Sequence, residues 1–222
     1  MSEHEGHRQR LRERYLRAGL DGMAEHEVLE LILTYAIPRR DVKPIAKALI
    51  LRFKDLRGVM QAPDKELRSV EGVGENAAAL LRLFLPVARM CAMQSMGDKP
   101  CLDSVRTVKQ YCRNLIGGER EEKLYLLCLD PRLHLKNSVF LADGTVNGIT
   151  ITPRRIAEEA LRSGATGVIL THNHPSGNPE PSGEDIAFTL EVSRALRALD
   201  IPLYDHIVVG EECTSLKERG DL

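Results

Sequence analysis

The sequence lacks the paired cysteines that a structural metal site or a disulfide framework would need. Its five cysteines are odd in number and widely spaced, and no C-x-x-C pair occurs among them. This usage is typical of a reducing compartment, so we expect a cytoplasmic protein with free thiols.

The sequence also lacks an apolar leader and any long apolar run. It begins MSEHEGHRQR, which has no apolar core for a signal peptide. No run approaches the roughly 20 consecutive apolar residues that a membrane-spanning helix needs. We therefore expect neither export nor membrane insertion. No internal repeat or low-complexity segment is present, and 222 residues with 43% hydrophobic and 28% charged side chains suit two small globular domains.

A strong excess of charge of either sign is missing as well. Residues 1–95 carry 16 Lys and Arg against 13 Asp and Glu, whereas the remainder carries 15 against 19. Strong nucleic-acid binders usually show a concentrated basic patch. This mild asymmetry permits a nucleic-acid contact in the first third of the chain without predicting one.

The spacing of apolar residues changes near residue 95, from a helical period to a mixture of strand and helix patterns. Before it, apolar residues recur at helical spacing, which predicts helices over 6–18, 25–36, 42–53 and 78–93, with short helices at 56–60 and near 67–70. The segment 96–103 has the composition of a linker. After it we expect helices over 105–116, from Pro153 and over 186–199, and strands over 123–129, 135–142, 145–151, 168–170 and 204–209, with a hairpin turn at Asp143-Gly144. The fold class is therefore α+β, with a helical domain over 1–95 and an α/β domain over 104–222.

A group of candidate metal ligands follows the apolar run at 168–170. His172 and His174 are two residues apart, so at a strand end they point to the same face. A turn-rich loop then leads to Asp185 at the start of a predicted helix. Two imidazoles and one carboxylate suit zinc and leave a fourth position open for water, as in catalytic zinc sites.

A second interpretation covers part of this pattern. Ser182 to Asp185 reads S-x-x-D, which as a capping box would satisfy the free amides at a helix start. Histidines at a strand end can also be ordinary polar residues. The three residues together favour the metal site.

The string H-x-H-x(7)-S-x-x-D resembles the metal motif of JAB/MPN (JAMM-type) metalloprotease domains. The flanking text, HNHPSG at 172–177 and DHIVVG at 205–210, is similar to the bacterial RadC family. Nearly the whole chain fits that family. The resemblance implies a JAB/MPN (cytidine-deaminase-like) domain with a mixed sheet flanked by helices, Zn²⁺ as the cofactor, and cleavage of a peptide or isopeptide-like bond in a peptide or protein substrate.

A metal-activated water needs a general base, and spacing alone does not choose among the available carboxylates: Glu119, Glu121, Glu122, Glu158 and Glu159. The RadC resemblance implies Glu122, the glutamate just before the strand that ends in Asp130. Glu122 would take the proton of the attacking water and return it to the leaving amine. The same resemblance makes Ser182 a hydrogen-bond donor to the oxyanion.

The segment Gly72-Val73-Gly74 lies between two predicted helices and resembles a helix-hairpin-helix, a module that binds the DNA backbone. Glu71 and Glu75 flank it, and carboxylates beside a phosphate site oppose binding. A glycine-flanked turn also serves plain helix packing. A DNA contact through this hairpin is thus one interpretation of two.

Asp205 and His206 are adjacent on a predicted strand, so their side chains point to opposite faces. His206 either orients a metal ligand or is an ordinary core histidine. The first functional hypothesis is a zinc-dependent hydrolase. The alternatives are a DNA-associated, repair-related protein in which the metal is structural, and a metal-dependent nuclease. The oligomeric state is open.

Overall fold

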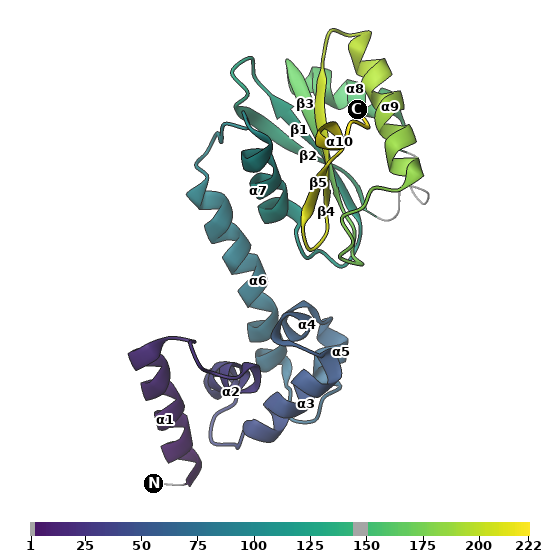
Figure 1. Ribbon diagram of the computed structural model, residues 1–222. Coiled ribbons are helices and arrows are strands. Elements are labelled where there is room, and N and C mark those ends of the chain that lie inside the picture. Colours follow the sequence, from purple (N-terminus) through teal and green to yellow (C-terminus); the bar gives the residue numbers. More distant parts are fainter. Residues whose placement is uncertain (1–2, 144–150) are drawn as a thin grey trace. The chain divides into compact units, whose positions relative to one another are not determined.

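The computed structural model describes residues 3–143 and 151–222 (Figure 1). The chain divides into two compact units, Met1–Ala88 and Arg89–Leu222. The boundary between the two units falls inside the helix Glu75–Ser95. The segment 96–103, predicted as a linker, lies in the second unit, where Leu102 N–H donates to Leu133 O and Leu135 N–H donates to Pro100 O. Whether 96–103 separates independently folding domains stays a prediction.

The described part of the first unit is helical throughout, as the apolar spacing predicts. Its helices are α1 (Glu3–Ala18), α2 (Glu25–Ala36), α3 (Lys43–Phe53), α4 (Leu56–Gln61), α5 (Asp64–Arg68) and the start of α6 (Glu75–Ser95). The core is aliphatic, with Leu29, Leu33, Leu49, Leu67 and Leu81 fully buried. Each such side chain contributes about 1.5–3 kcal/mol relative to an exposed one.

The turn between α5 and α6 requires a glycine at position 72. Gly72 has φ +89°, a left-handed conformation that side chains rarely adopt. A Cβ at this position would lie 2.6 Å from Ile45 Cδ1 in the core. Val73 is buried beside it, so its side chain anchors the hairpin inward. The left-handed φ and the close approach of Ile45 both favour glycine at position 72.

By length and composition alone, α6 is apolar enough to cross a bilayer, and 17% of its most apolar stretch is buried. Arg82 and Arg89 interrupt it, and Arg89 forms an ion pair with Glu119. One such helix is weak evidence for membrane insertion.

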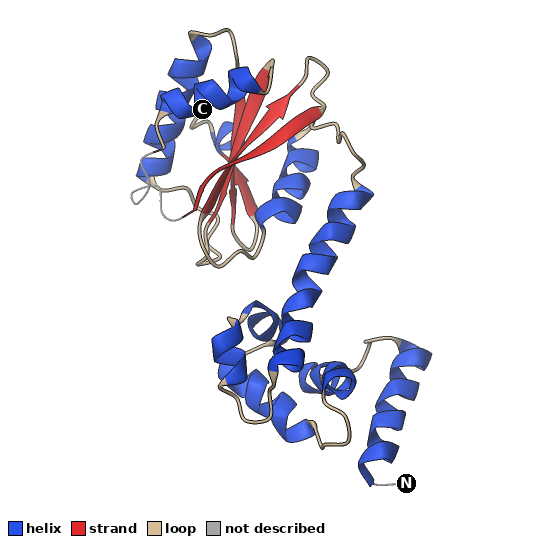
Figure 2. Ribbon diagram, turned by 180° about the vertical axis from the view of Figure 1, so that it is seen from behind, coloured by secondary structure: helices blue, strands red, loops and turns tan. Residues whose placement is uncertain are grey.

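The second unit is built on a five-stranded mixed sheet (Figure 2). The strand order is β2-β1-β3-β4-β5, formed by β1 (Lys123–Leu129), β2 (Leu135–Asp143), β3 (Gly167–Asn173), β4 (Leu203–Val209) and β5 (Cys213–Ser215). Strand β1 is antiparallel to β2 and β3, β3 is parallel to β4, and β4 is antiparallel to β5. The expected α+β fold with a mixed sheet flanked by helices is confirmed.

Helices cover both faces of this sheet (Figures 1 and 2). On one face α7 (Val105–Ile116) packs through Val108, Tyr111 and Cys112 against Leu127 and Ile169. On the other, α8 (Pro153–Arg162) and α9 (Gly183–Arg197) pack on the alternate residues of the same strands, Leu126, Cys128, Val168 and Leu170. Strand β3 is buried along its whole length, which explains its uninterrupted apolar run.

Two short elements follow β4 that the sequence pattern did not predict, β5 and α10 (Leu216–Arg219). The predicted Asp143-Gly144 turn and the predicted strand over 145–151 fall almost wholly outside the described residues. Ile151, the one residue of that strand that is described, lies in no strand.

Candidate metal centre

Strand β3 and helix α9 bring the three predicted ligands together. His172 is the penultimate residue of β3, and His174 directly follows the end of that strand. Asp185 is the third residue of α9. The intervening loop contains Pro175, Pro179 and Pro181, which prevent either element from continuing. One ligand pair thus comes from a rigid strand end and the third from a capped helix start.

The distances between the ligand atoms suit one ion. His172 Nε2 lies 3.0 Å from His174 Nε2 and 3.4 Å from Asp185 Oδ1. His174 Nε2 lies 3.6 Å from Asp185 Oδ2. Around an ion with metal–ligand bonds of about 2.1 Å, tetrahedral ligand atoms lie about 3.4 Å apart. The cluster therefore fits a small ion, and it is the only group of this kind in the part of the chain that the structure describes.

A chain of hydrogen bonds behind His172 fixes its tautomer. The Thr189 hydroxyl donates to Asp185 O at 2.6 Å, so its oxygen accepts the hydrogen bond from His206 Nδ1–H. His206 Nε2 then carries no proton and accepts from His172 Nδ1–H at 2.7 Å. It follows that His172 Nε2 carries no proton and directs its lone pair toward the cluster.

His174 is fixed in the same way by a backbone carbonyl. Its Nδ1 lies 2.8 Å from Asn178 O, which accepts only, so Nδ1 carries a proton and, in the neutral ring, Nε2 carries none. Two Nε2 lone pairs therefore face each other at 3.0 Å, an arrangement that is repulsive unless a cation lies between them. A proton or a metal ion meets that need.

The pKa shifts follow from this geometry. Burial lowers the pKa of His172 to about 4, against the opposing charge of Asp185. The hydrogen bond with Asp185 raises the pKa of His174, and the charge of Glu122 adds to the effect. Burial acts to raise the pKa of Asp185, but its contacts with His174, His172 and Ser182 hold that pKa well below its usual range. A neutral His172 and an ionised Asp185 are the protonation states that metal binding needs.

Ser182 caps α9 and orients Asp185 at the same time. Its Oγ–H and its N–H both donate to Asp185 Oδ2, at 2.6 Å and 2.7 Å, and Asp185 N–H donates to Ser182 Oγ at 3.1 Å. The capping box is thus present together with the ligand cluster, and Asp185 serves both. A contact of Ser182 with an oxyanion stays a prediction.

Glu122 lies half-buried directly before β1, close enough to His174 for its charge to affect that pKa. Three of the other carboxylates form ion pairs: Glu119 with Lys123 and Arg89, Glu158 with Arg154, and the buried Glu159 with Arg155 and Arg162. The role of Glu122 as general base stays a prediction.

The adjacent residues Asp205 and His206 point to opposite faces, as expected for a strand. His206 contacts His172 at 2.7 Å, a contact that favours the interpretation in which it orients a ligand, and that role stays a prediction. Asp205 accepts hydrogen bonds from Ser215 Oγ and Lys217 N–H, which fasten the end of the chain to β4. The sequence did not indicate Thr189 or Asn178, because neither belongs to a recognisable spacing.

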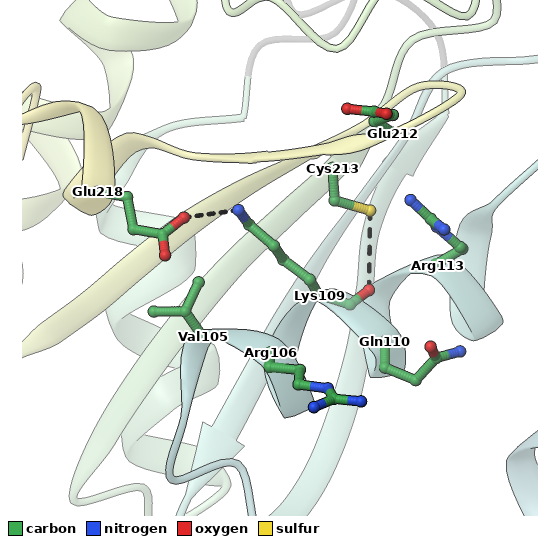
Figure 3. Close-up of a pocket in the computed structure, with 8 residues that line it drawn as sticks. All are labelled: Val105, Arg106, Lys109, Gln110, Arg113, Glu212, Cys213 and Glu218. Carbon is green, nitrogen blue, oxygen red and sulfur yellow. Dashed lines mark hydrogen bonds and ion pairs between the residues drawn. The ribbon is translucent and has the colours of Figure 1, made fainter.

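The hairpin Gly72-Val73-Gly74 belongs to the first unit, and a DNA contact there stays a prediction. Glu71 beside it is 97% exposed and lies 4.0 Å from Arg40. A separate cleft of about 370 Å³ lies between α7 and the β5–α10 end of the second unit (Figure 3). Arg106, Lys109 and Arg113 line it with Glu212 and Glu218, and Lys109 pairs with Glu218. None of the three predicted ligands lines it.

A mixed sheet that presents two histidines at a strand end and an aspartate at the following helix defines a JAB-type metal-binding domain. Residues 102–221 match the RadC-like JAB domain, and residues 4–79 match the UPF0758 N-terminal family. The chain is also 36% identical over 219 residues to a UPF0758 protein of Fusobacterium nucleatum, an alignment that covers 93% of this chain and 92% of that protein. The chain belongs to the RadC family. This membership and the His172–His174–Asp185 cluster favour a metal-dependent hydrolase.

Proposed function

We propose that the protein is a zinc-dependent hydrolase that cleaves a peptide or isopeptide-like amide bond. The observation that carries the proposal is the geometry of the cluster, in which the Nε2 atoms of His172 and His174 lie 3.0 Å apart beside the Asp185 carboxylate. Two imidazole nitrogens and one carboxylate oxygen are a donor set that suits zinc and leaves one coordination position for a water or a substrate.

His172, His174 and Asp185 would hold the ion. Bound zinc supplies a Lewis acid that polarises a carbonyl and lowers the pKa of water toward neutrality. Asp185 also reduces the net positive charge of the site, and the hydrogen bonds from Ser182 keep its second oxygen in place.

Glu122 acts as the general base and then as the general acid. Its carboxylate accepts a proton from the attacking water as the new C–O bond forms at the amide carbon. It returns that proton to the nitrogen as the C–N bond breaks, so that the products are a carboxylic acid and an amine. The position of Glu122 near His174 supports this role.

Ser182 is the proposed hydrogen-bond donor to the oxyanion. This role competes with the hydrogen bond that its hydroxyl donates to Asp185 at the start of α9. The Oγ–H donates to Asp185 Oδ2, while the Ser182 N–H already donates to the same oxygen. The hydroxyl can therefore turn to a substrate oxygen while the backbone amide keeps Asp185 in place. A Ser182→Ala variant would lose the oxyanion contact and retain one of the two hydrogen bonds to Oδ2.

The test is cleavage of a peptide library by zinc-loaded protein, compared with the Glu122→Gln variant. The proposal expects cleavage by the native protein and at least 100-fold slower cleavage by Glu122→Gln at equal zinc content. Equal rates for the two proteins would refute the role of Glu122. No cleavage by a zinc-loaded native protein would count against the peptidase proposal.

A DNA-associated function is the second proposal, and it rests on the hairpin at Gly72-Val73-Gly74. The left-handed Gly72 and the helix that begins at Glu75 leave Gly74 exposed at a helix start. Binding through phosphates would weaken steeply with salt. Absence of DNA binding at low salt would remove this proposal.

A further inference from the structure

Asn173 lies between the two histidine ligands in the sequence and points away from them. Successive residues of a strand alternate between its faces, so Asn173 faces the side opposite to His172. It is 1% exposed, which is exceptional for a primary amide at a strand end. The role proposed above for the metal cluster does not explain why a buried amide stands at this position.

The amide of Asn173 directs three hydrogen bonds, including both of its N–H groups, to one segment of backbone. Its Oδ1 accepts from Lys123 N–H at 2.8 Å. Its Nδ2 donates to Glu121 O at 3.0 Å and to Glu119 O at 3.3 Å. All three partners belong to the segment 119–123, about 50 residues earlier in the chain.

Glu122 lies inside this segment, between the carbonyl of Glu121 and the amide of Lys123. Both of these backbone groups are held by the same Asn173 side chain, so the backbone on each side of Glu122 is fixed to β3. The Glu119 carboxylate also pairs with Arg89 of α6, and its ion pair with Lys123 Nζ at 2.8 Å links the two ends of the segment. Strand β3 thus carries the ligands on one side and the clamp for the glutamate segment on the other.

We propose that Asn173 is a positioning residue that holds Glu122 toward the metal centre. This inference rests on the proposed function, since it assigns Asn173 a role in placing the general base. It also explains the residue type, because asparagine alone offers one acceptor and two donors at this side-chain length. Aspartate has the same shape but would turn a carboxylate oxygen toward two carbonyl oxygens.

The experiment compares Asn173→Asp and Asn173→Ala with the native protein and with Thr171→Val. Thr171 is a buried residue on the same face of β3, and it forms none of the hydrogen bonds to 119–123, so its variant controls for general disturbance of the strand. Three quantities are measured for each full-length protein: zinc per chain, amide hydrogen exchange along β1 and β3, and cleavage of the peptide library.

We expect both Asn173 variants to keep about one zinc per chain, because no ligand is changed. Exchange of the Lys123 amide should become at least tenfold faster in them, with no comparable change at Leu170, and Thr171→Val should leave both rates unchanged. Cleavage should fall at least tenfold, and adding Glu122→Gln to Asn173→Asp should lower it further by much less than Glu122→Gln does alone.

Two results would overturn the inference. Loss of zinc in both Asn173 variants would mean that Asn173 supports the ligands rather than the glutamate segment. An unchanged Lys123 exchange rate would mean that no clamp exists. Absence of cleavage by native, zinc-loaded protein is a different result, because it contradicts the proposed function while the exchange rates still decide whether Asn173 clamps the segment.

Discussion

The Nδ1 atom of His172 lies 2.7 Å from Nε2 of His206, and both rings are buried. Because His206 Nδ1–H donates to the Thr189 oxygen, His206 Nε2 accepts from His172 Nδ1–H, and His172 Nε2 faces the cluster without a proton. The two histidines come from neighbouring parallel strands, β3 and β4. The ligand geometry is therefore a property of the sheet and not of the metal motif alone.

Replacement of His206 by alanine should weaken zinc binding about 10–100-fold, because the His172 ring would lose the partner that fixes its tautomer and orientation. Competition with a chromophoric chelator measures the dissociation constant. His134→Ala is the matched control, since His134 is partly exposed and its ion pair is with Asp130, which is not one of the three predicted ligands. Equal affinities for His206→Ala and the native protein would show that the hydrogen bond does not support the ligand.

Glu122→Gln should retain zinc and lose hydrolysis, because the amide cannot accept the proton from water. Glu121→Gln removes the same charge one residue earlier, on an exposed side chain, and should keep most of the activity. Zinc content is measured by atomic absorption and cleavage by mass spectrometry of the peptide library. A reversed result, with Glu121→Gln inactive and Glu122→Gln active, would move the general base to Glu121.

Gly72→Ala should destabilise the first unit by ~2 kcal/mol or more, because the left-handed φ and the approach to Ile45 both oppose a side chain. Gly74→Ala is the control. Its Cβ meets no atom within 4 Å, and the change should alter stability by about 0.5 kcal/mol or less. Chemical unfolding monitored by circular dichroism compares the two. Equal stability would mean that the hairpin relaxes without cost.

Burial raises the pKa of the Cys112 thiol to about 12, so this thiol stays protonated in the folded protein at alkaline pH. In the unfolded chain it ionises near its ordinary value of about 8.5–9. Between these two values the folded state binds the extra proton, so the thiol reduces stability by about 1.4 kcal/mol per pH unit as the pH rises. The stability contribution is unaffected below the unfolded pKa.

Unfolding free energies measured between pH 8 and pH 10.5 test this linkage. The native protein should lose stability more steeply than Cys112→Ala over that range. Native-state thiol titration gives a second readout, in which the exposed Cys91 reacts rapidly and the buried Cys112 does not. Parallel pH curves for the two proteins would contradict the shift.

The clustering of the three candidate ligands could be predicted from the sequence because local rules place them. Alternation on a strand puts His172 and His174 on one face, and the S-x-x-D pattern marks the start of α9 at Asp185. The buried run of β3 and the periodic helices follow from the same short-range patterns. These local rules do not distinguish Glu122 from the other carboxylates, and only the family resemblance indicated it as the general base.

What the sequence could not provide depends on long-range pairing. The contact of His206 with His172 requires the parallel pairing of β3 and β4, which no local pattern encodes. The hydrogen bonds of Asn173 join residues about 50 positions apart. Strand β5 and helix α10 span three and four residues, too few for a periodic signal, and are held by Asp205 through Ser215 and Lys217.

We propose that His172, His174 and Asp185 hold one zinc ion in an open site. The most direct measurement is the zinc content of untagged native protein beside that of His174→Ala, with His134→Ala as the control for loss of a histidine. We expect about one zinc per chain in the native protein and in His134→Ala, and none in His174→Ala. Absence of zinc from the native protein after incubation with the ion, or full retention in His174→Ala, would contradict it.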